Sequence, residues 1–294
     1  MRSHRSNRDL FRLTLHFLSR SHPQTHPQSQ PQSQPQSQPQ SQSQTQPHPQ
    51  TQTHPQTQSQ QMSTFHFKEF SIQQDVSAMK VGADAMILGS LVDAKLKVNG
   101  LDIGTGTGVL SLMIAQKNKN ICINAIEIDV ESAKEAELNF QNSSWSNRLR
   151  IVHADFRTFF PEIQFDLIIS NPPYFENGIL NESVRKANSR HEDSLPLQEL
   201  FRKVEAILAP NGHFWLILPF ETAAKWKMKA TELKLFCEKE IIIFGKPNLP
   251  KRAVFCFSKV GVECEKSSVL IRTENNEYSN EYKELTVAFH GVKL

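Results

Sequence analysis

Strand and helix patterns alternate along residues 98–258, and this alternation constrains the fold more than any other feature. Apolar runs typical of buried strands occupy residues 98–104, 121–129, 149–155, 165–171 and 213–219. Helical apolar spacing occupies residues 109–117, 130–142, 195–212 and 222–234. Strands that alternate with helices form a mainly parallel sheet with helices on both faces. The pattern therefore predicts an α/β, Rossmann-like fold.

Residues 239–260 show two further strand patterns joined by a Gly/Pro turn. We expect them to form an antiparallel hairpin at one edge of the sheet, which then has seven strands. Ligands of such sheets bind beyond the carboxyl ends of the parallel strands. Polar residues at those strand ends are therefore the candidates for a functional site.

The first 61 residues differ sharply from the rest in composition. Residues 21–61 contain no Asp, Glu, Lys or Arg and consist almost entirely of Gln, Pro, Ser, Thr and His. Such a segment has little apolar surface to offset its ordering entropy, so we predict a disordered extension, residues 1–61, before one ordered domain, residues 62–294. Residues 1–20 are rich in arginine, as targeting peptides are, but ordered composition begins at Met62 and favours an upstream extension or a mis-assigned start.

Hydropathy argues against a membrane-spanning protein and cysteine spacing against a metal-binding one, while the net charge of residues 62–294 does not by itself indicate a nucleic-acid-binding protein. Residues 1–20 carry five Arg and one Asp, a net charge of +4, whereas the whole chain carries +3, so residues 62–294 are close to neutral. No apolar stretch reaches the roughly 18 residues of a transmembrane helix. The four cysteines form no CxxC pair, which favours reduced thiols in the cytoplasm and argues against a metal site.

The strand pattern at residues 98–104 runs into a turn with three glycines, LDIGTGTG. Glycines let a backbone turn tightly and approach a ligand closely. A dinucleotide fingerprint would need glycine at position 109, where this chain has Val109. The spacing instead resembles the first motif of class I S-adenosylmethionine (AdoMet) methyltransferases. This resemblance implies that the cofactor is bound by Asp102, Gly104, Gly106 and Gly108.

The next two strand patterns end in residues suited to the same ligand. Glu127 follows the glycine turn by about 20 residues, where a carboxylate can accept hydrogen bonds from both ribose hydroxyls. The third pattern ends in HADF, and the methyltransferase resemblance implies that Asp155 takes the adenine amino group while Phe156 lies against the ring. A solvent-exposed charge explains Glu127 alone equally well, but three strand ends in register with the expected residue types rarely arise by chance.

The fourth pattern ends in SNPPY, which holds Asn171, Pro172, Pro173 and Tyr174. This motif resembles the catalytic motif of methyltransferases that modify planar exocyclic or amide nitrogens, which are poor nucleophiles because their lone pair is delocalised. The side-chain oxygen of Asn171 and a backbone carbonyl can accept hydrogen bonds from the two N–H groups of the target amine. Both contacts favour a pyramidal geometry at its nitrogen. The prolines restrict the loop and remove competing donors, and Tyr174 can stack on a flipped base. Asn171 is also a candidate cofactor-binding residue, because it lies at the same edge of the sheet. The alternative to a catalytic motif is a rigid turn formed by the two prolines.

Segments outside this core narrow the resemblance. Residues 65–92 are similar to the corresponding part of the tRNA1(Val) adenine-N6 methyltransferases, which modify the adenine 3′ of the anticodon. NPPYFENG, SRHEDSLPLQEL, GKPNLPKRAVFCF and EYKELTVAFH are also similar, so the resemblance spans residues 63–290. One departure is Ala83, where the family has Thr. DNA adenine, release-factor glutamine and ribosomal guanine-N2 methyltransferases share the motif but differ in added domains or in the residue at position 174.

Basic and aromatic residues near the predicted site form the candidate RNA-binding surface. They are Phe67, Lys68, Lys80, Arg185, Arg190, Lys246, Lys251 and Arg252. Lysine and arginine bind phosphates, and aromatic rings stack on splayed bases. A solvated surface charge is the alternative for each cation.

Together, these features and the family resemblance imply a cytoplasmic, monomeric, AdoMet-dependent enzyme without a metal or a membrane segment. The resemblance implies that its substrate is the N6 of an adenine in a tRNA anticodon stem-loop, at the adenine 3′ of the anticodon of a valine tRNA. Two alternatives stay open, a protein glutamine-N5 methyltransferase and a non-catalytic nucleotide-binding module.

Overall fold

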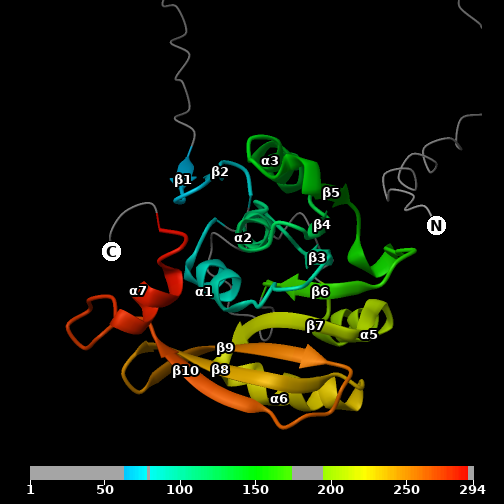
Figure 1. Cartoon of the computed structure of the whole chain (residues 1–294). Helices are drawn as coiled ribbons and strands as arrows, with labels where there is room; N and C mark the ends of the chain where they lie inside the picture. Colours follow the sequence, from blue (N-terminus) through cyan, green and yellow to red (C-terminus); the bar gives the residue numbers. More distant parts are fainter. Residues whose placement is uncertain (1–62, 78–79, 174–194, 291–294) are drawn as a thin grey trace, which may run out of the picture. The chain divides into compact units, whose positions relative to one another are not determined.

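One eight-stranded sheet organises the part of the chain that this computed structural model describes, residues 63–77, 80–173 and 195–290 (Figure 1). These residues belong to one unit, Gln58–Leu294. The strand order is β10-β8-β9-β7-β6-β3-β4-β5, and within the sheet only β9 runs antiparallel to its neighbours. The strands are β3 (Asn99–Ile103), β4 (Cys122–Glu127), β5 (Leu149–His153), β6 (Phe165–Ser170), β7 (Leu208–Pro219), β8 (Phe236–Lys246), β9 (Leu249–Ser258) and β10 (Glu265–Leu270).

The mostly parallel sheet with an antiparallel hairpin is confirmed, with two differences from the prediction. The strand β10 adds an eighth strand beside β8, and its mostly exposed residues carry no apolar signal. The helix predicted for residues 195–212 ends at Ile207, and residues 208–212 belong to β7. Pro210 lacks an N–H and disfavours the helical conformation of the residue before it, which accounts for the early end of this helix.

Helices cover both faces of the sheet, as predicted. One apolar cluster joins the strands to α1 (Ala83–Leu91), α2 (Val109–Lys117), α3 (Val130–Gln141) and α7 (Asn280–Thr286). The other joins them to α5 (Leu197–Ile207) and α6 (Phe220–Glu232). Adjacent residues of β6 divide between the clusters, Ile169 in the first and Ile168 in the second, so this strand is buried on both sides.

Short elements complete the described structure. A two-stranded sheet of β1 (Thr64–His66) and β2 (Ser71–Gln73) precedes α1, and the 3-10 helices η1 (Ser146–Arg148) and η2 (Phe156–Thr158) flank β5. Among the described residues, none of the helices combines the length and the hydropathy needed to span a bilayer.

Candidate active site

The glycine turn and the Asn-Pro-Pro segment are neighbours at the carboxyl edge of the sheet. Ile103, the last residue of β3, pairs with Ile126 of β4 on one side and with Ser170 of β6 on the other. The Ser170 hydroxyl also donates a hydrogen bond of 2.9 Å to the Ile103 carbonyl oxygen. Gly104 and Asn171 each follow one of these paired residues, so the structure brings the two motifs together.

Positive φ angles shape the glycine turn: 69° at Gly104, 54° at Gly106 and 83° at Gly108. A Cβ atom at Gly104 or Gly106 would meet no atom within 4 Å, so open space adjoins the first part of the turn. A Cβ atom at Gly108 would lie 2.5 Å from the ring of Phe140 in α3. The first two glycines therefore form a cradle open to a ligand, whereas the third allows α2 to start against α3.

Asp102 is fully buried beneath the turn, and one oxygen of its carboxylate is unsatisfied. Its Oδ2 accepts hydrogen bonds from the hydroxyls of Thr105 at 2.6 Å and Ser111 at 2.8 Å. Its Oδ1 has no hydrogen-bond partner within the described part of the chain. Burial raises the pKa of Asp102 to about 6, although the bonds from Thr105 and Ser111 act in the opposite direction. A buried acceptor of this kind suits a cationic amine of a ligand.

Glu127 holds the glycine turn through its side chain. Its Oε2 accepts a hydrogen bond from the Gly106 N–H at 2.9 Å, and its Oε1 accepts from Ile128 at 2.9 Å and Asp129 at 3.0 Å. A carboxylate has about four acceptor sites, so roughly one is left for a ligand. Binding both ribose hydroxyls, as the sequence predicts, therefore requires one of the three backbone bonds to open.

Asp155 and Phe156 reach the same edge because Glu127 pairs with His153 across β4 and β5. Asp155 accepts hydrogen bonds from the main-chain N–H of Arg157 at 2.8 Å and from its Nε at 2.7 Å, and the guanidinium bond lowers the pKa of this carboxyl. Phe156 is only 4% exposed and packs in the apolar cluster that includes α5. Little of the Phe156 ring is therefore accessible for the predicted stacking of adenine.

Asn171 and Pro172 are buried at the end of β6, whereas Pro173 is exposed. Tyr174, the last residue of the predicted catalytic motif, lies outside the described residues. The buried Asn171 therefore lies next to Gly104 at the carboxyl edge of the sheet.

Two residues of α3 that were not predicted from the sequence bind the backbone next to the glycine turn. The buried carboxylate of Glu135 accepts three backbone hydrogen bonds, at 2.6, 2.9 and 3.0 Å, from the consecutive residues Asp75, Val76 and Ser77. The Asn139 amide donates to the carbonyl oxygens of Gln73 and Thr107, each at 2.9 Å.

Together the two side chains connect the segment before α1 to the glycine turn. Their spacing of four residues, which puts them on one face of the helix beside apolar positions, is the signal that could have indicated them.

The candidate RNA-binding residues are only partly brought together. Lys246 and Lys251 are exposed around the β8–β9 turn, which lies at the carboxyl edge because β9 runs antiparallel to β7 and pairs Arg252 with Pro219. Arg252 is paired with Asp84 of α1 at 2.8 Å, which compensates part of its charge. Lys68 and Lys80 are exposed; Arg185 and Arg190 lie outside the described residues.

Phe67 corrects one part of that prediction. The ring is 5% exposed and stacks on Phe70, with centroids 4.3 Å apart. Phe67 therefore fills the core beneath β1 and does not belong to an RNA-binding surface.

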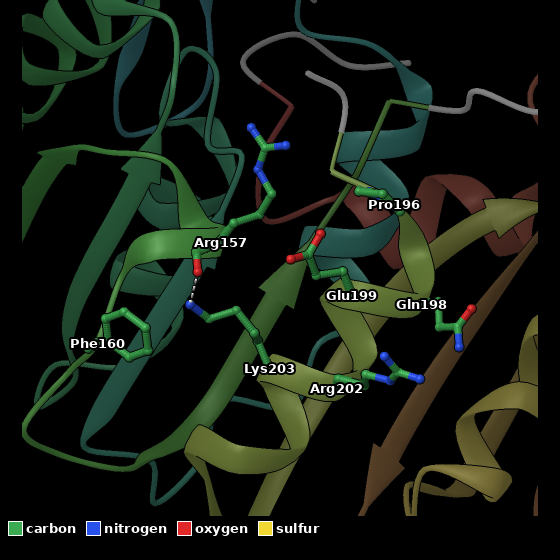
Figure 2. Close-up of a pocket in the computed structure, with 7 residues that line it drawn as sticks. All are labelled: Arg157, Phe160, Pro196, Gln198, Glu199, Arg202 and Lys203. Atoms are coloured by element: carbon green, nitrogen blue, oxygen red, sulfur yellow. Dashed lines mark hydrogen bonds between the residues drawn. The ribbon is translucent and has the colours of Figure 1, made fainter. Parts of the chain in front are cut away.

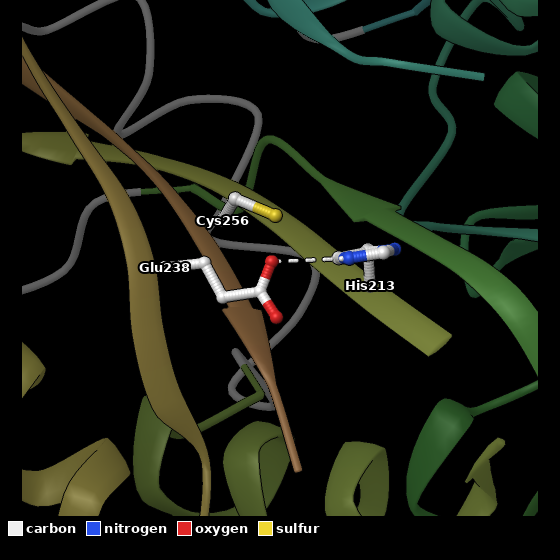
Figure 3. A group of neighbouring side chains, drawn as sticks. All are labelled: His213, Glu238 and Cys256. Carbon is white, nitrogen blue, oxygen red and sulfur yellow. Dashed lines mark hydrogen bonds and ion pairs between the residues drawn. The ribbon is translucent and has the colours of Figure 1, made fainter. Parts of the chain in front are cut away.

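A separate polar cluster lies on β7, β8 and β9, toward the amino edge of the sheet (Figure 3). His213 Nε2 lies 3.1 Å from Glu238, and the ligand atoms of these residues and of Cys256 lie within 4.8 Å of one another. The ammonium of Lys97 is 2.5 Å from His213 Nδ1, and burial together with Lys97 lowers the pKa of His213. A cation already placed against the ring disfavours a metal ion, so we assign this cluster to strand packing.

The strand order, the glycine turn after β3 and the Asn-Pro-Pro segment after β6 define a class I methyltransferase. A solved structure titled as a predicted O-methyltransferase from Agrobacterium tumefaciens shares the fold at a TM-score of 0.55 and 18% identity, covering 70% of this chain and 96% of that one. A family model, methyltransferase small domain, matches residues 75–235. The chain belongs to the tRNA1(Val) (adenine(37)-N6)-methyltransferase family, as the sequence predicts.

The assignment to this family rests on two curated relatives. The tRNA1(Val) (adenine(37)-N6)-methyltransferase of Flavobacterium psychrophilum is 37% identical over 230 residues, which cover 77% of this chain and 98% of the relative. The protein of the same name from Bacteroides fragilis is 34% identical over 77% of this chain and 97% of the relative.

Proposed function

We propose that this chain is a cytoplasmic, monomeric enzyme that uses AdoMet to methylate N6 of adenine 37 in the anticodon loop of a valine tRNA. The placement of Asn171 directly beside Gly104 carries the proposal, because it sets an acceptor for an amine next to a cradle for the methyl donor. The names of the two relatives support the same tRNA and the same adenine.

The residues at this edge fit AdoMet. Gly104 and Gly106 leave open space, and the unpartnered Oδ1 of Asp102 suits the methionine ammonium. Glu127 keeps an acceptor for a ribose hydroxyl, and the partly exposed Asp155 can accept from an adenine amino group. When bound, AdoMet supplies an electrophilic methyl group on a sulfonium sulfur.

Asn171 would orient and activate the target amine. Its side-chain oxygen accepts one N–H bond of the adenine amino group, and a main-chain carbonyl of the same loop accepts the other. Both contacts strengthen as the nitrogen becomes pyramidal and gains positive charge, so they act mainly on the chemical step.

Nucleoside mass spectrometry tests the proposal. The purified protein is incubated with methyl-labelled AdoMet and a transcript of tRNA1(Val), which is then digested. We expect labelled N6-methyladenosine from this transcript and none from a transcript with guanine at position 37. Label on a protein glutamine instead would support a glutamine-N5 methyltransferase, and AdoMet binding without transfer to either substrate would support a non-catalytic module.

A further inference from the structure

A pocket lies between η2 and the first turns of α5, beside the proposed cofactor site (Figure 2). The residue Arg157, which pairs with Asp155, forms one wall of this pocket. The other side is formed by α5, which contributes Gln198, Glu199, Arg202 and Lys203. Because η2 follows the carboxyl end of β5 after two residues, the pocket lies toward the same edge of the sheet as the glycine turn.

Phe160 stands at this pocket as an exposed but supported aromatic ring. Its side chain is 83% exposed, and the Lys203 ammonium lies 4.5 Å from the ring centroid. Lys203 is itself tied to the backbone after β5 by hydrogen bonds to the carbonyl oxygens of Arg157 at 2.6 Å and Phe159 at 2.9 Å. Core packing does not account for a large ring presented to solvent in this way, whereas such rings stack well on nucleic acid bases.

The charge of the pocket favours a polyanion. Arg157, Arg202 and Lys203 stand against the carboxylates of Glu199 and of Asp155, which pairs with Arg157, so the net charge is about +1, although residues 62–294 as a whole are close to neutral. Arg157 and Lys203 already hold contacts within the protein, while Arg202 is exposed on α5 and can reach a phosphate. A stacking ring next to an arginine matches the two halves of a nucleotide, its base and its phosphate.

We propose that this pocket binds a nucleotide of the anticodon loop a few positions from the target adenine, with its base on Phe160 and its phosphate at Arg202. The inference rests on the proposed function. The strand β5 is three strands from β6 in the sheet, and strands are about 4.8 Å apart, so η2 lies roughly 14 Å from Asn171 along the edge. A few nucleotides of a single-stranded loop span that distance.

Binding of a tRNA anticodon stem-loop by matched variants tests the assignment. Phe160→Ala is expected to weaken RNA binding between about fivefold and a hundredfold, the range found for loss of one stacked base, and Phe160→Trp should restore it. Arg202→Gln should reduce the dependence of log K on log salt concentration by roughly 0.7, since one phosphate contact is lost. Calorimetry should show unchanged AdoMet affinity for both variants.

Leu96→Ala and Lys119→Gln serve as controls, because both residues are exposed in the turns before β3 and β4, at the opposite edge of the sheet. If wild-type protein methylates the tRNA but Phe160→Ala and Arg202→Gln bind the stem-loop as the controls do, the pocket assignment fails and the proposed function stands. If wild-type protein methylates no tRNA, the proposed function fails first. AMP binding by the same variants is measured as a second probe. If Phe160→Ala and Arg202→Gln lose AMP binding but keep stem-loop binding, the pocket binds free nucleotides and the inference is overturned.

Discussion

Asn171 is the side chain on which the proposed chemistry depends most. Replacing it by alanine deletes one acceptor for the target amine and leaves the glycine turn intact. Because contacts of this kind strengthen in the transition state, Asn171→Ala should lower the single-turnover rate of methyl transfer by about 10²–10³. Asn171→Asp keeps an acceptor of similar reach and should be milder.

Rapid-quench assays with labelled AdoMet measure these rates, and AdoMet affinity should stay near normal in both variants. An alanine variant that retains more than about a tenth of the wild-type rate would exclude the amide as the acceptor for the amine. The two prolines would then only shape a turn.

Asp102 predicts a pH dependence of cofactor binding. Burial raises its pKa to about 6, so the free protein holds a carboxylate above that pH and a neutral carboxyl below it. Only the carboxylate pairs with the methionine ammonium, so AdoMet affinity should fall as the pH drops from about 7.5 to 5, by up to about tenfold per unit below the pKa. Calorimetry across this range measures the trend, and Asp102→Asn should bind weakly with a flat profile. Equal affinities of the wild-type protein across the range would limit Asp102 to supporting the turn.

The residues at the carboxyl edge of the sheet were predictable from the sequence, whereas most of their contacts were not. Asp102, Glu127 and Asn171 were found because parallel strands end at one edge of a sheet, and a strand period is visible in the sequence. The three backbone bonds of Glu127 and the burial of Phe156 were not visible, because they depend on turns and on the packing of η2 against α5, which is distant along the chain.

Elements were predictable in proportion to their burial. The strand β6 carries apolar residues on both faces, so its sequence alone indicated it. The strand β10 begins with four exposed residues and ends with the half-buried Val269 and Leu270, so EKSSVL shows little of the apolar pattern of a buried strand. Backbone pairing of an exposed edge strand depends on where its partner lies, which a local pattern does not contain.

Glu135 should matter for both stability and cofactor binding. Glu135→Ala removes the acceptor for three backbone N–H groups of residues 75–77, so we expect a loss of about 2–4 kcal/mol in the free energy of unfolding. AdoMet affinity should also fall, because Asn139 joins the same segment to the glycine turn. Glu137→Ala, an exposed change on the same helix, is the control for thermal denaturation and calorimetry. Identical behaviour of the two variants would show that α3 does not hold this segment in place.

The strands β8 and β10 are expected to be joined by a disulfide under oxidising conditions. The Sγ atoms of Cys237 and Cys264 lie 3.0 Å apart. Diamide should take up the two hydrogens that the thiols lose, forming one S–S bond and raising the melting temperature, since crosslinking a loop of this length stabilises by about 3–4 kcal/mol. Peptide mass spectrometry identifies the bond, and Cys237→Ser is the control. Finding each thiol singly alkylated after diamide treatment would contradict the expectation.

In the whole molecule, residues 62–294 should fold and function without residues 1–61. Residues 21–61 lack side chains that could join a core, so a protein that begins at Met62 should keep the melting temperature and the methylation rate of the full chain. Scanning calorimetry and the tRNA methylation assay compare the two proteins. A clear loss of either property on truncation would assign the extension a part in folding or catalysis.

The two ends of the described domain meet, and this has a consequence for how the protein is made. Phe67 forms an isolated antiparallel bridge with His290, and the Lys68 N–H donates to the Phe289 carbonyl oxygen at 2.9 Å. Ribosomes add about 5–20 residues per second, so roughly 11 to 45 seconds pass between the synthesis of Phe67 and that of His290. The segment that continues to Gln73 and, through Asn139, to the glycine turn is therefore expected to settle only after residue 290 has been made, so we expect the nascent chain to bind AdoMet weakly before that point.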